Sequence, residues 1–227
     1  RGVLGVDITV ERLLPVAVAA AQELAHRAPP DLQSRTVVIG YDRRFLAPEL
    51  AEAITAAVRG CELEPLLTET AVPTPACSWA VVERQALGAL VITASHNPPE
   101  WLGLKIKGPF GGSVEGDFTA AVERRLAAGG ITAPIQGSVA RFDGRGDHLD
   151  GLRRKLNIPG LISGLRAMNL KVIVDPMHGS AAGCVKDLLG PEGHQLVEEI
   201  RSERDPLFGG NPPEPLAPYL RELIEAV

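Results

Sequence analysis

The sequence has little of several residue types that mark particular classes of protein. Aromatic residues make up only 4% of the 227 residues, so a buried core must be built mainly from Val, Leu, Ile and Ala. The cysteines, Cys61, Cys77 and Cys184, are far apart and odd in number. This arrangement gives neither a disulfide framework nor the spacing of a cysteine metal site. Reduced thiols of this kind are typical of the cytoplasm, where we expect this protein to work.

Basic stripes and long apolar runs are also missing. The net charge is −5, and no run of Lys and Arg alternates with aromatic residues, so we expect no nucleic-acid partner. No apolar run is long enough to span a bilayer, and Arg1 does not begin a signal peptide, so we expect no membrane partner. The chain lacks an initiator Met, and the helical pattern that ends at Val227 predicts a further strand. We therefore expect a piece of a longer polypeptide, cut at both ends.

What the sequence does contain is the composition of a globular protein, with 45% apolar and 22% charged residues. Apolar runs of strand length alternate with helix-spaced patterns. This predicts an α/β fold of layered α/β/α domains with mainly parallel mixed sheets. The pattern occurs in two similar blocks, of which the second is incomplete. We predict a first domain over residues 1–135, a linker over residues 136–147 and a second domain over residues 148–227.

Gly and Pro residues bound most of the predicted elements. Strands are predicted over residues 35–41, 63–67, 88–93, 104–107, 170–174 and 196–200. Helices are predicted over residues 13–26, 48–59, 76–85, 115–128, 148–156, 179–189 and 216–227.

One short segment stands out chemically. Residues 93–98 read Thr-Ala-Ser-His-Asn-Pro and directly follow the apolar run 89–92, which is typical of a buried strand. A serine in a turn after such a strand is a candidate reactive group, but its hydroxyl needs a partner that manages the proton. His96 is adjacent to Ser95, and adjacency alone does not show that the two side chains meet.

Lys105 is the better candidate partner for Ser95, because a neighbouring strand can bring it back to the turn. The alternative is a solvated lysine on the polar face of a half-buried strand, since Leu104 and Ile106 would face the other way. That alternative fits Lys107 at least as well. Asp42, together with the two arginines that follow it, is interpreted as a structural salt-bridge cluster rather than a catalytic group.

The segment from Thr93 to Lys105 resembles the phosphoserine loop of the α-D-phosphohexomutases, the phosphoglucomutase and phosphomannomutase family. The hexamer is intact, and Gly103 and Lys105 are in register, whereas Leu102 stands where the family usually has Asn. Other segments resemble the family in the same order along the chain: residues 1–3, 40–45, 72–76, 174–179 and 208–215.

The resemblance implies a parent enzyme that interconverts hexose 1-phosphate and hexose 6-phosphate through a phosphoserine and a bisphosphate intermediate. Ser95 would carry the phosphoryl group and, through its phosphate, would be a ligand of Mg²⁺. Lys105 would be a general acid/base or would stabilise charge on the transferring group. Arg1 and His96 would form hydrogen bonds near the phosphate, and Asn97 would lie beside it. A sugar 1,6-bisphosphate would be the activator, and the residues around the loop favour glucose or mannose over glucosamine.

The family's metal-binding run, Asp-x-Asp-x-Asp-Arg, does not occur in the sequence. We therefore expect the other Mg²⁺ ligands to lie in missing C-terminal domains of the same polypeptide, and we expect this chain alone to be inactive. The alternative is a non-catalytic fragment or divergent relative that acts as a binding or assembly module. A serine hydrolase is disfavoured because no Gly-x-Ser-x-Gly motif surrounds Ser95.

Overall fold

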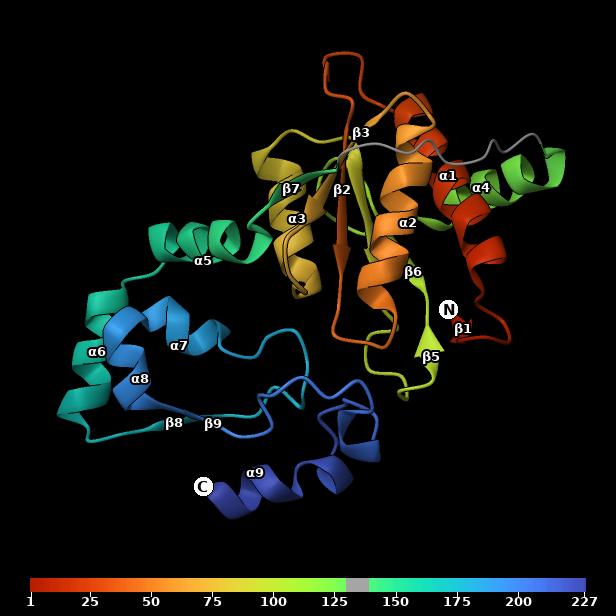
Figure 1. Ribbon diagram of the computed structural model, residues 1–227. Helices are drawn as coiled ribbons and strands as arrows, with labels where there is room; N and C mark the ends of the chain where they lie inside the picture. The colour runs from red at the N-terminus through yellow and green to blue at the C-terminus, as the bar shows by residue number, and fades with distance from the viewer. Residues whose placement is uncertain (130–138) are drawn as a thin grey trace.

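Strands and helices alternate along the chain in a computed structural model that describes residues 1–129 and 139–227 (Figure 1). The strands of the first block are β1 (Gly2–Val3), β2 (Thr36–Tyr41), β3 (Glu64–Thr68), β4 (Gly88–Ile92), β5 (Trp101–Leu102), β6 (Leu104–Lys107) and β7 (Ala140–Phe142). Its helices are α1 (Val10–His26), α2 (Ala47–Arg59), α3 (Thr74–Glu83) and α4 (Gly116–Ala128).

The first block is built on a five-stranded sheet with the order β6-β4-β2-β3-β7. Neighbouring strands are parallel except for β6, which runs antiparallel to β4 and pairs Lys105 with Val91. The carboxyl ends of β2 and β4 therefore lie side by side at one edge of the sheet. This confirms the predicted mixed α/β fold with a mainly parallel sheet.

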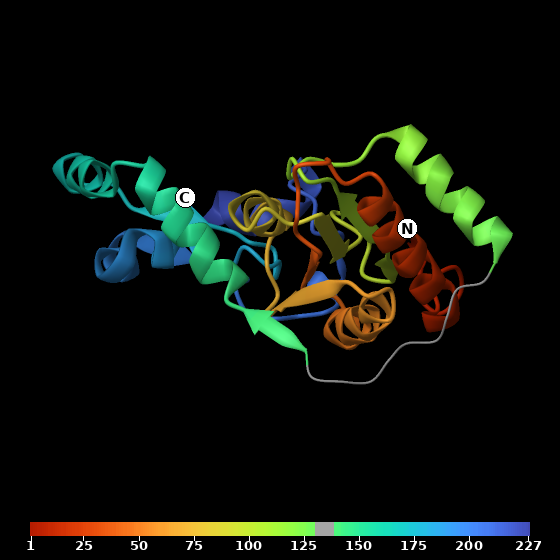
Figure 2. The ribbon, with the colours of Figure 1, turned by 90° about the horizontal axis from the view of Figure 1, so that it is seen from above.

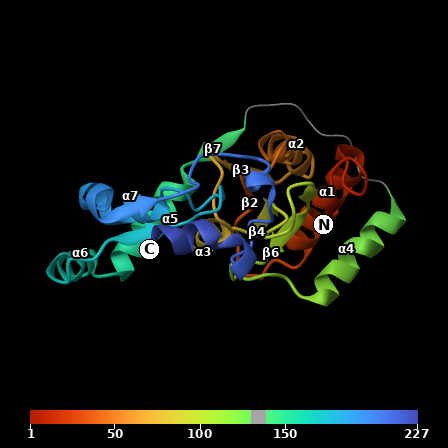
Figure 3. The same ribbon diagram turned by 90° about the horizontal axis from the view of Figure 1, so that it is seen from below.

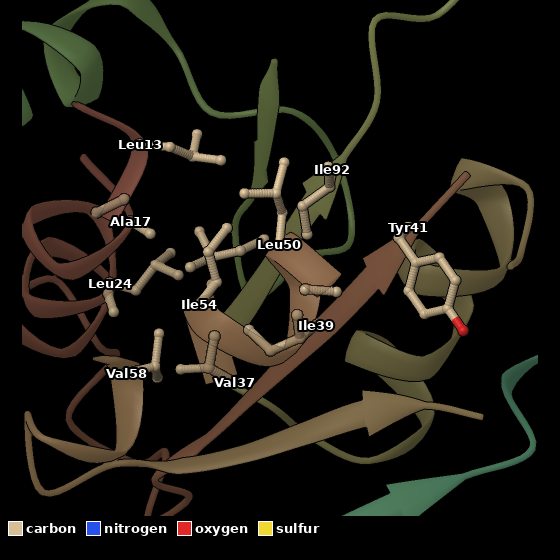
Figure 4. Packing of buried hydrophobic residues seen from close by; sticks show 14 of the residues in the cluster. Leu13, Ala17, Leu24, Val37, Ile39, Tyr41, Leu50, Ile54, Val58 and Ile92 are labelled. Atoms are coloured by element: carbon tan, nitrogen blue, oxygen red, sulfur yellow. The ribbon is translucent and has the colours of Figure 1, made fainter. Parts of the chain in front are cut away.

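The two central strands, β2 and β4, bury both of their faces. On β2, Val37 and Ile39 pack with α1 and α2 in one apolar cluster (Figure 4), whereas Val38 faces the opposite way and packs with α3. This alternation follows from the two-residue period of a strand. The helices consequently form two layers around the sheet, with α4 outside α1 (Figure 2). Small side chains such as Ala17 and Ala51 let these layers approach closely, as expected for a core with few aromatics.

The second block begins with α5 and carries a separate two-stranded parallel sheet. Its strands are β8 (Val172–Val174) and β9 (Val197–Glu199). Its helices are α5 (Gly144–Lys155), α6 (Ile158–Ala167), α7 (Cys184–Leu189), α8 (Gly193–Leu196) and α9 (Arg221–Ala226). Short 3₁₀ turns cover residues 190–192, 208–210 and 217–219. The predicted helix over residues 216–227 is thus a 3₁₀ turn followed by the shorter α9.

The predicted linker, residues 136–147, is not an irregular segment where the structure describes it. Its residues 140–142 form β7, the edge strand that pairs with β3, and α5 begins at Gly144. Residues 136–138 lie outside the described part of the chain. The division of the chain into domains stays a prediction.

The two blocks are joined by the packing of α5 on α3. Gly151 of α5 lies directly against the Trp79 indole, and a Cβ at this position would collide with the ring. Arg154 and Lys155 lie over the same ring, 5.7 and 5.4 Å from its centre. An ion pair between Arg84 and Asp147 (2.5 Å) closes the other end of this contact.

His148 lies in this contact, and its burial leads us to expect a free energy of unfolding that depends on pH. Its ring lies 6.3 Å from that of Trp79, and its Nδ1 is buried without a hydrogen-bond partner. Burial lowers the pKa of His148 because an imidazolium cannot be solvated there. The unfolded chain then binds a proton more readily than the folded chain. We expect the free energy of unfolding to be highest above pH ~6.5 and to fall as the pH decreases from there towards the folded-state pKa.

Urea unfolding of the wild type and of His148→Gln, measured across this pH range, checks the prediction. The variant should lose less stability than the wild type as the pH falls. The exposed His26 supplies the matched control, His26→Gln, which should follow the wild type. Parallel curves for wild type and His148→Gln would contradict the prediction.

Candidate functional site

The Ser95 turn lies at the carboxyl edge of the first sheet, where ligands commonly bind in open α/β folds. β4 ends at Ile92 and leads into Thr93 and Ser95, and the neighbouring β2 ends one residue before Asp42. The segment after β9 lies across this edge of the sheet (Figures 1 and 3). Residues that are far apart in the sequence therefore meet above the ends of β2 and β4.

A cavity of about 270 Å³ separates the two blocks at this edge. From the first block it is lined by Asp42, Arg43, Thr74, Thr93, Ser95 and His96. From the second block it is lined by Pro176, Gly179, Ser180, Ala181, Phe208 and Pro213. The predicted phosphoserine loop and the second block thus form one site.

A larger groove of about 990 Å³ lies between α6 and α7, far along the second block. None of the predicted site residues lines it, and its walls are mostly aliphatic. We place the functional site at the smaller cavity. Of the two, it is the one that is lined by the candidate nucleophile together with several other polar side chains.

The backbone of Ser95 is in the left-handed region, with a φ of 61°. Such a conformation is uncommon for a residue other than glycine and is often found at functional sites. The turn is braced from within: the Ser95 amide donates to Thr93 Oγ1 (2.8 Å), and the Asn97 amide and side chain both donate to the Ala94 carbonyl. Asn97 therefore supports the loop with its side chain.

Arg44 lies beneath this turn. The sequence did not predict that its side chain would contact the Ser95 loop. Its side chain is only 1% exposed, and its guanidinium donates to backbone carbonyls of the loop. The only sequence signal is two consecutive arginines after a buried strand, which does not say which of them turns inward. Arg43 turns the other way, lines the cavity and donates to the Ser202 carbonyl (2.7 Å).

Asp42 connects the cavity with the buried cation. Its Oδ2 lies 3.3 Å from Arg44 Nε, and its Oδ1 accepts from the Arg44 amide (3.0 Å). Burial raises the pKa of Asp42, and hydrogen bonds from Thr93 and Arg44 oppose that shift. Burial likewise lowers the pKa of Arg44 against the opposing charge of Asp42. The structure thus contains the Asp42–Arg44 part of the predicted salt-bridge cluster, whereas Arg43 contacts the second block. Burying two charges offsets much of their attraction, so the pair adds little net stability.

Lys105 lies on β6, one strand away from β4, and is partly buried. Burial lowers the pKa of its ammonium, the charges of Lys107 and Arg1 lower it further, and the charge of Asp42 acts in the opposite direction. The charges of Arg1 and of Asp42, a carboxylate that lines the cavity, therefore both act on the Lys105 ammonium. It is not among the residues that line the cavity itself.

Arg1 is brought to the loop by the pairing of β1 with β5. A Cβ on Gly103 would lie only 2.7 Å from the Arg1 Cβ, so a glycine is required for this close approach. The Gly103 carbonyl in turn accepts from the Thr93 amide (3.0 Å). Arg1 thus packs against Gly103, which is hydrogen-bonded to Thr93, two residues before Ser95.

His96 points away from the core of the loop and is 55% exposed. Its Nε2 lies 3.8 Å from a carboxylate oxygen of Glu214 in the second block. The structure therefore brings His96 to the seam between the blocks.

The described lining of the cavity does not fit a Mg²⁺ site. It offers one carboxylate, Asp42, whose oxygens face Arg44. Within residues 1–129 and 139–227, no group of three or more His, Cys, Asp or Glu side chains is arranged to hold a metal ion. Mg²⁺ prefers six oxygen ligands in near-octahedral geometry. The residues of this chain alone do not supply them.

The fold and the site define an α/β/α protein with a serine turn at the seam between two blocks. Family models agree: phosphoglucomutase/phosphomannomutase α/β/α domain I matches residues 1–130, and α/β/α domain II of the same family matches residues 147–227. The chain belongs to the phosphoglucomutase/phosphomannomutase family. Among the described residues, no helix has the length and apolar character needed to cross a membrane.

Individual relatives carry several names. A phosphoglucosamine mutase of Synechococcus sp. (strain RCC307) is 30% identical over 197 residues, covering 87% of this chain and 40% of the relative. A phosphoglucomutase of Staphylococcus epidermidis (strain ATCC 12228 / FDA PCI 1200) is 28% identical over 193 residues, covering 80% of this chain and 34% of the relative.

Solved structures of the same family resemble this chain in fold. A protein of Thermus thermophilus, provisionally assigned as a phosphomannomutase, superposes with a TM-score of 0.84 at 31% identity. That match covers 99% of this chain and 49% of the other. The chain thus spans less than half the length of these relatives.

Proposed function

We propose that this chain is the phosphoryl-carrying part of a hexose-phosphate mutase, in which Ser95 accepts and returns the phosphoryl group. The substrate class is a hexose phosphate. The named relatives include mutases of glucose and of glucosamine phosphates, so we propose no particular sugar beyond this class. Mg²⁺, held largely by residues outside this chain, and a sugar 1,6-bisphosphate activator belong to the same proposal.

The observation that carries this proposal is the placement of Ser95. Its turn opens into a cavity that Arg43 also lines, its amide is hydrogen-bonded to Thr93, and its carbonyl accepts from the buried Arg44 guanidinium. Phosphoryl transfer depends mainly on positioning and on neutralising the charge of the phosphoryl oxygens. Arg1, Arg43 and Lys105 supply positive charge near the turn, as this chemistry requires.

The roles of the neighbouring residues follow from this placement. Lys105 would take or return the proton of the sugar hydroxyl, and Arg1 would compensate the charge of the phosphoserine. His96 would contact the phosphate or its acceptor from the seam, and Asn97 would keep the turn in shape.

Mapping phosphate on the protein tests this proposal. We expect the protein purified as its complete polypeptide to carry one phosphate, located by peptide mass spectrometry on Ser95. An unmodified Ser95 that also resists labelling by glucose 1,6-bisphosphate would overturn it.

The pH dependence of turnover should report on Lys105. Because its pKa is lowered, more neutral amine is available at a given pH than for an exposed lysine, which suits a group that accepts a proton. We expect kcat to rise with pH up to this pKa. Lys105→Arg should lose that rise together with about 100-fold in kcat, because an arginine stays charged.

Lys107→Arg is the matched control, since Lys107 lies on the same strand with its Nζ hydrogen-bonded to Ser113. It should keep both the rate and the pH profile. If Lys105→Arg were nearly as active as the wild type, Lys105 would act only as a fixed positive charge.

The 227-residue chain tested by itself is expected to show no appreciable turnover of glucose 1-phosphate with glucose 1,6-bisphosphate as activator. The Asp-x-Asp-x-Asp-Arg run that the family uses for its metal does not occur among these residues. A coupled assay for glucose 6-phosphate measures this, and rapid turnover would refute the prediction.

A further inference from the structure

The side chain of Arg44 is buried in the protein interior, where arginines are seldom found. Its side chain is 1% exposed, although charged residues are almost never fully buried unless they are paired. It follows β2 and lies under the turn that carries Ser95. Its contacts explain why a charge is tolerated there.

The two terminal nitrogens of the guanidinium donate four hydrogen bonds to the loop. Nη1 donates to two carbonyl oxygens and Nη2 to two others, at distances from 2.7 to 3.0 Å. The acceptors are the carbonyls of Ser95, Asn97, Pro98 and Trp101. One planar group therefore binds four backbone oxygens, that of Ser95 and three from the six residues that follow it.

The remaining donor faces the partner carboxylate. Nε makes no hydrogen bond and lies 3.3 Å from Asp42 Oδ2 in an ion pair. Four converging carbonyl dipoles would repel one another without a cation between them, and hydrogen bonds from a charged donor are stronger than neutral ones. Arg44 thus holds together an arrangement that the backbone alone would not favour.

The arrangement includes the strained residue. Ser95 has a φ of 61°, and its own carbonyl is one of the four acceptors. Fixing that carbonyl fixes ψ of Ser95, and the internal bond from its amide to Thr93 Oγ1 restrains the other side. The direction of the Ser95 side chain follows from these two restraints.

Arg44 also contacts the second block. Its guanidinium lies over the Phe208 ring, 5.0 Å from the ring centre, and its backbone carbonyl accepts from Arg204 (3.4 Å). Phe208 is itself buried and lines the cavity. The same side chain therefore touches the loop of Ser95 and the loop that faces it.

We propose that Arg44 is a positioning residue, which holds the Ser95 loop in its left-handed conformation and aligns that loop with the Phe208 segment of the second block. Its effect on phosphoryl transfer rests on the proposed function, whereas its effect on the loop does not. Lysine cannot replace it, because a single ammonium cannot reach four separated carbonyls.

Amide hydrogen exchange on the complete polypeptide tests the positioning directly. The probes are the amides of Ser95, Asn97 and Trp101, each of which is hydrogen-bonded within the loop. In Arg44→Lys these amides should exchange at least about tenfold faster than in the wild type, through local opening of the loop. Glu23→Gln is the matched control, because it weakens the ion pairs of the buried Glu23 with Arg27 and Arg125, between α1 and α4, and leaves the loop contacts intact.

Kinetics supply the second readout. In Arg44→Lys, kcat should fall about 100-fold, as for a misplaced reacting group, with little change in KM. Glu23→Gln should leave both nearly unchanged at a temperature where it is folded. If the three loop amides in Arg44→Lys exchanged no faster, relative to the amides of β2 and β4, than they do in Glu23→Gln, the positioning role would be refuted. Faster loop exchange in a protein without phosphate on Ser95 would support the positioning and refute only the proposed function.

Discussion

Replacing Ser95 with alanine is expected to abolish phosphate incorporation and to lower kcat by a factor on the order of 10⁴ to 10⁶, the range seen when one member of a catalytic unit is removed. The hydroxyl oxygen is the only atom that this change deletes, so the loop contacts of Arg44 and Asn97 should persist. The measurement is intact mass together with mutase turnover of the complete polypeptide. Ser113→Ala, at an exposed serine outside the cavity, is the control and should behave as the wild type.

Two further variants at position 95 separate chemistry from conformation. Ser95→Thr keeps a hydroxyl, but a β-branched residue disfavours a φ of 61°, so we expect a distorted loop and a large loss of kcat. Ser95→Gly removes the hydroxyl and the strain, so it should be inactive yet more stable by about 1 kcal/mol. A Ser95→Gly protein that is less stable than Ser95→Ala would contradict the strain argument.

Replacing Glu23 with glutamine is expected to reduce the free energy of unfolding by about 1 to 2 kcal/mol, because it weakens the charge-assisted hydrogen bonds that a buried carboxylate accepts from two arginines, which are themselves about one-third exposed. The Glu23 side chain is 5% exposed and lies 2.6 Å from both Arg27 and Arg125, which joins α1 to α4. Burial alone would raise the pKa of Glu23, but hydrogen bonds from Arg125 and Arg27 outweigh it and the pKa is lowered.

The sign of the pH dependence follows from this lowered pKa. The contribution of Glu23 is fully present above its unfolded pKa, ~4.5, and is lost as the pH falls through the lower folded value. Urea unfolding of wild type and Glu23→Gln should therefore differ most near neutral pH and converge in acid. Asp117→Asn is the control, because Asp117 pairs with the same Arg27 but is 68% exposed, and it should matter much less. Equal effects of the two variants would argue against a role for burial.

The strands and helices of the first block could be predicted well because their signals are local. Apolar runs bounded by Gly or Pro placed β2, β4 and β6 within a residue or two of their observed bounds. β7 could not be predicted, because three residues carry no periodicity and only pairing with β3 makes them a strand. α6 was missed since Pro159, Gly160 and Gly164 lower its helix propensity and none of its residues is buried.

The candidate site could be predicted only in part for a similar reason. The hexamer around Ser95 is contiguous, so a motif finds it. Arg44 is separated from Ser95 by half a domain of sequence, and its inward rotation depends on how β2 packs beside β4. His96 and Glu214 are more than a hundred positions apart, and their proximity depends on how the second block lies against the first.

The sequence by itself determined the family, the mixed α/β fold and the identity of the candidate phosphoryl carrier, because each rests on short segments whose own residues are contiguous in the chain. Only the tertiary structure decided that a buried arginine holds the serine turn, that Lys105 lies beside rather than within the cavity, and that the second block covers the turn. These depend on long-range packing, in which a side chain's direction is set by strands and helices that no local pattern specifies.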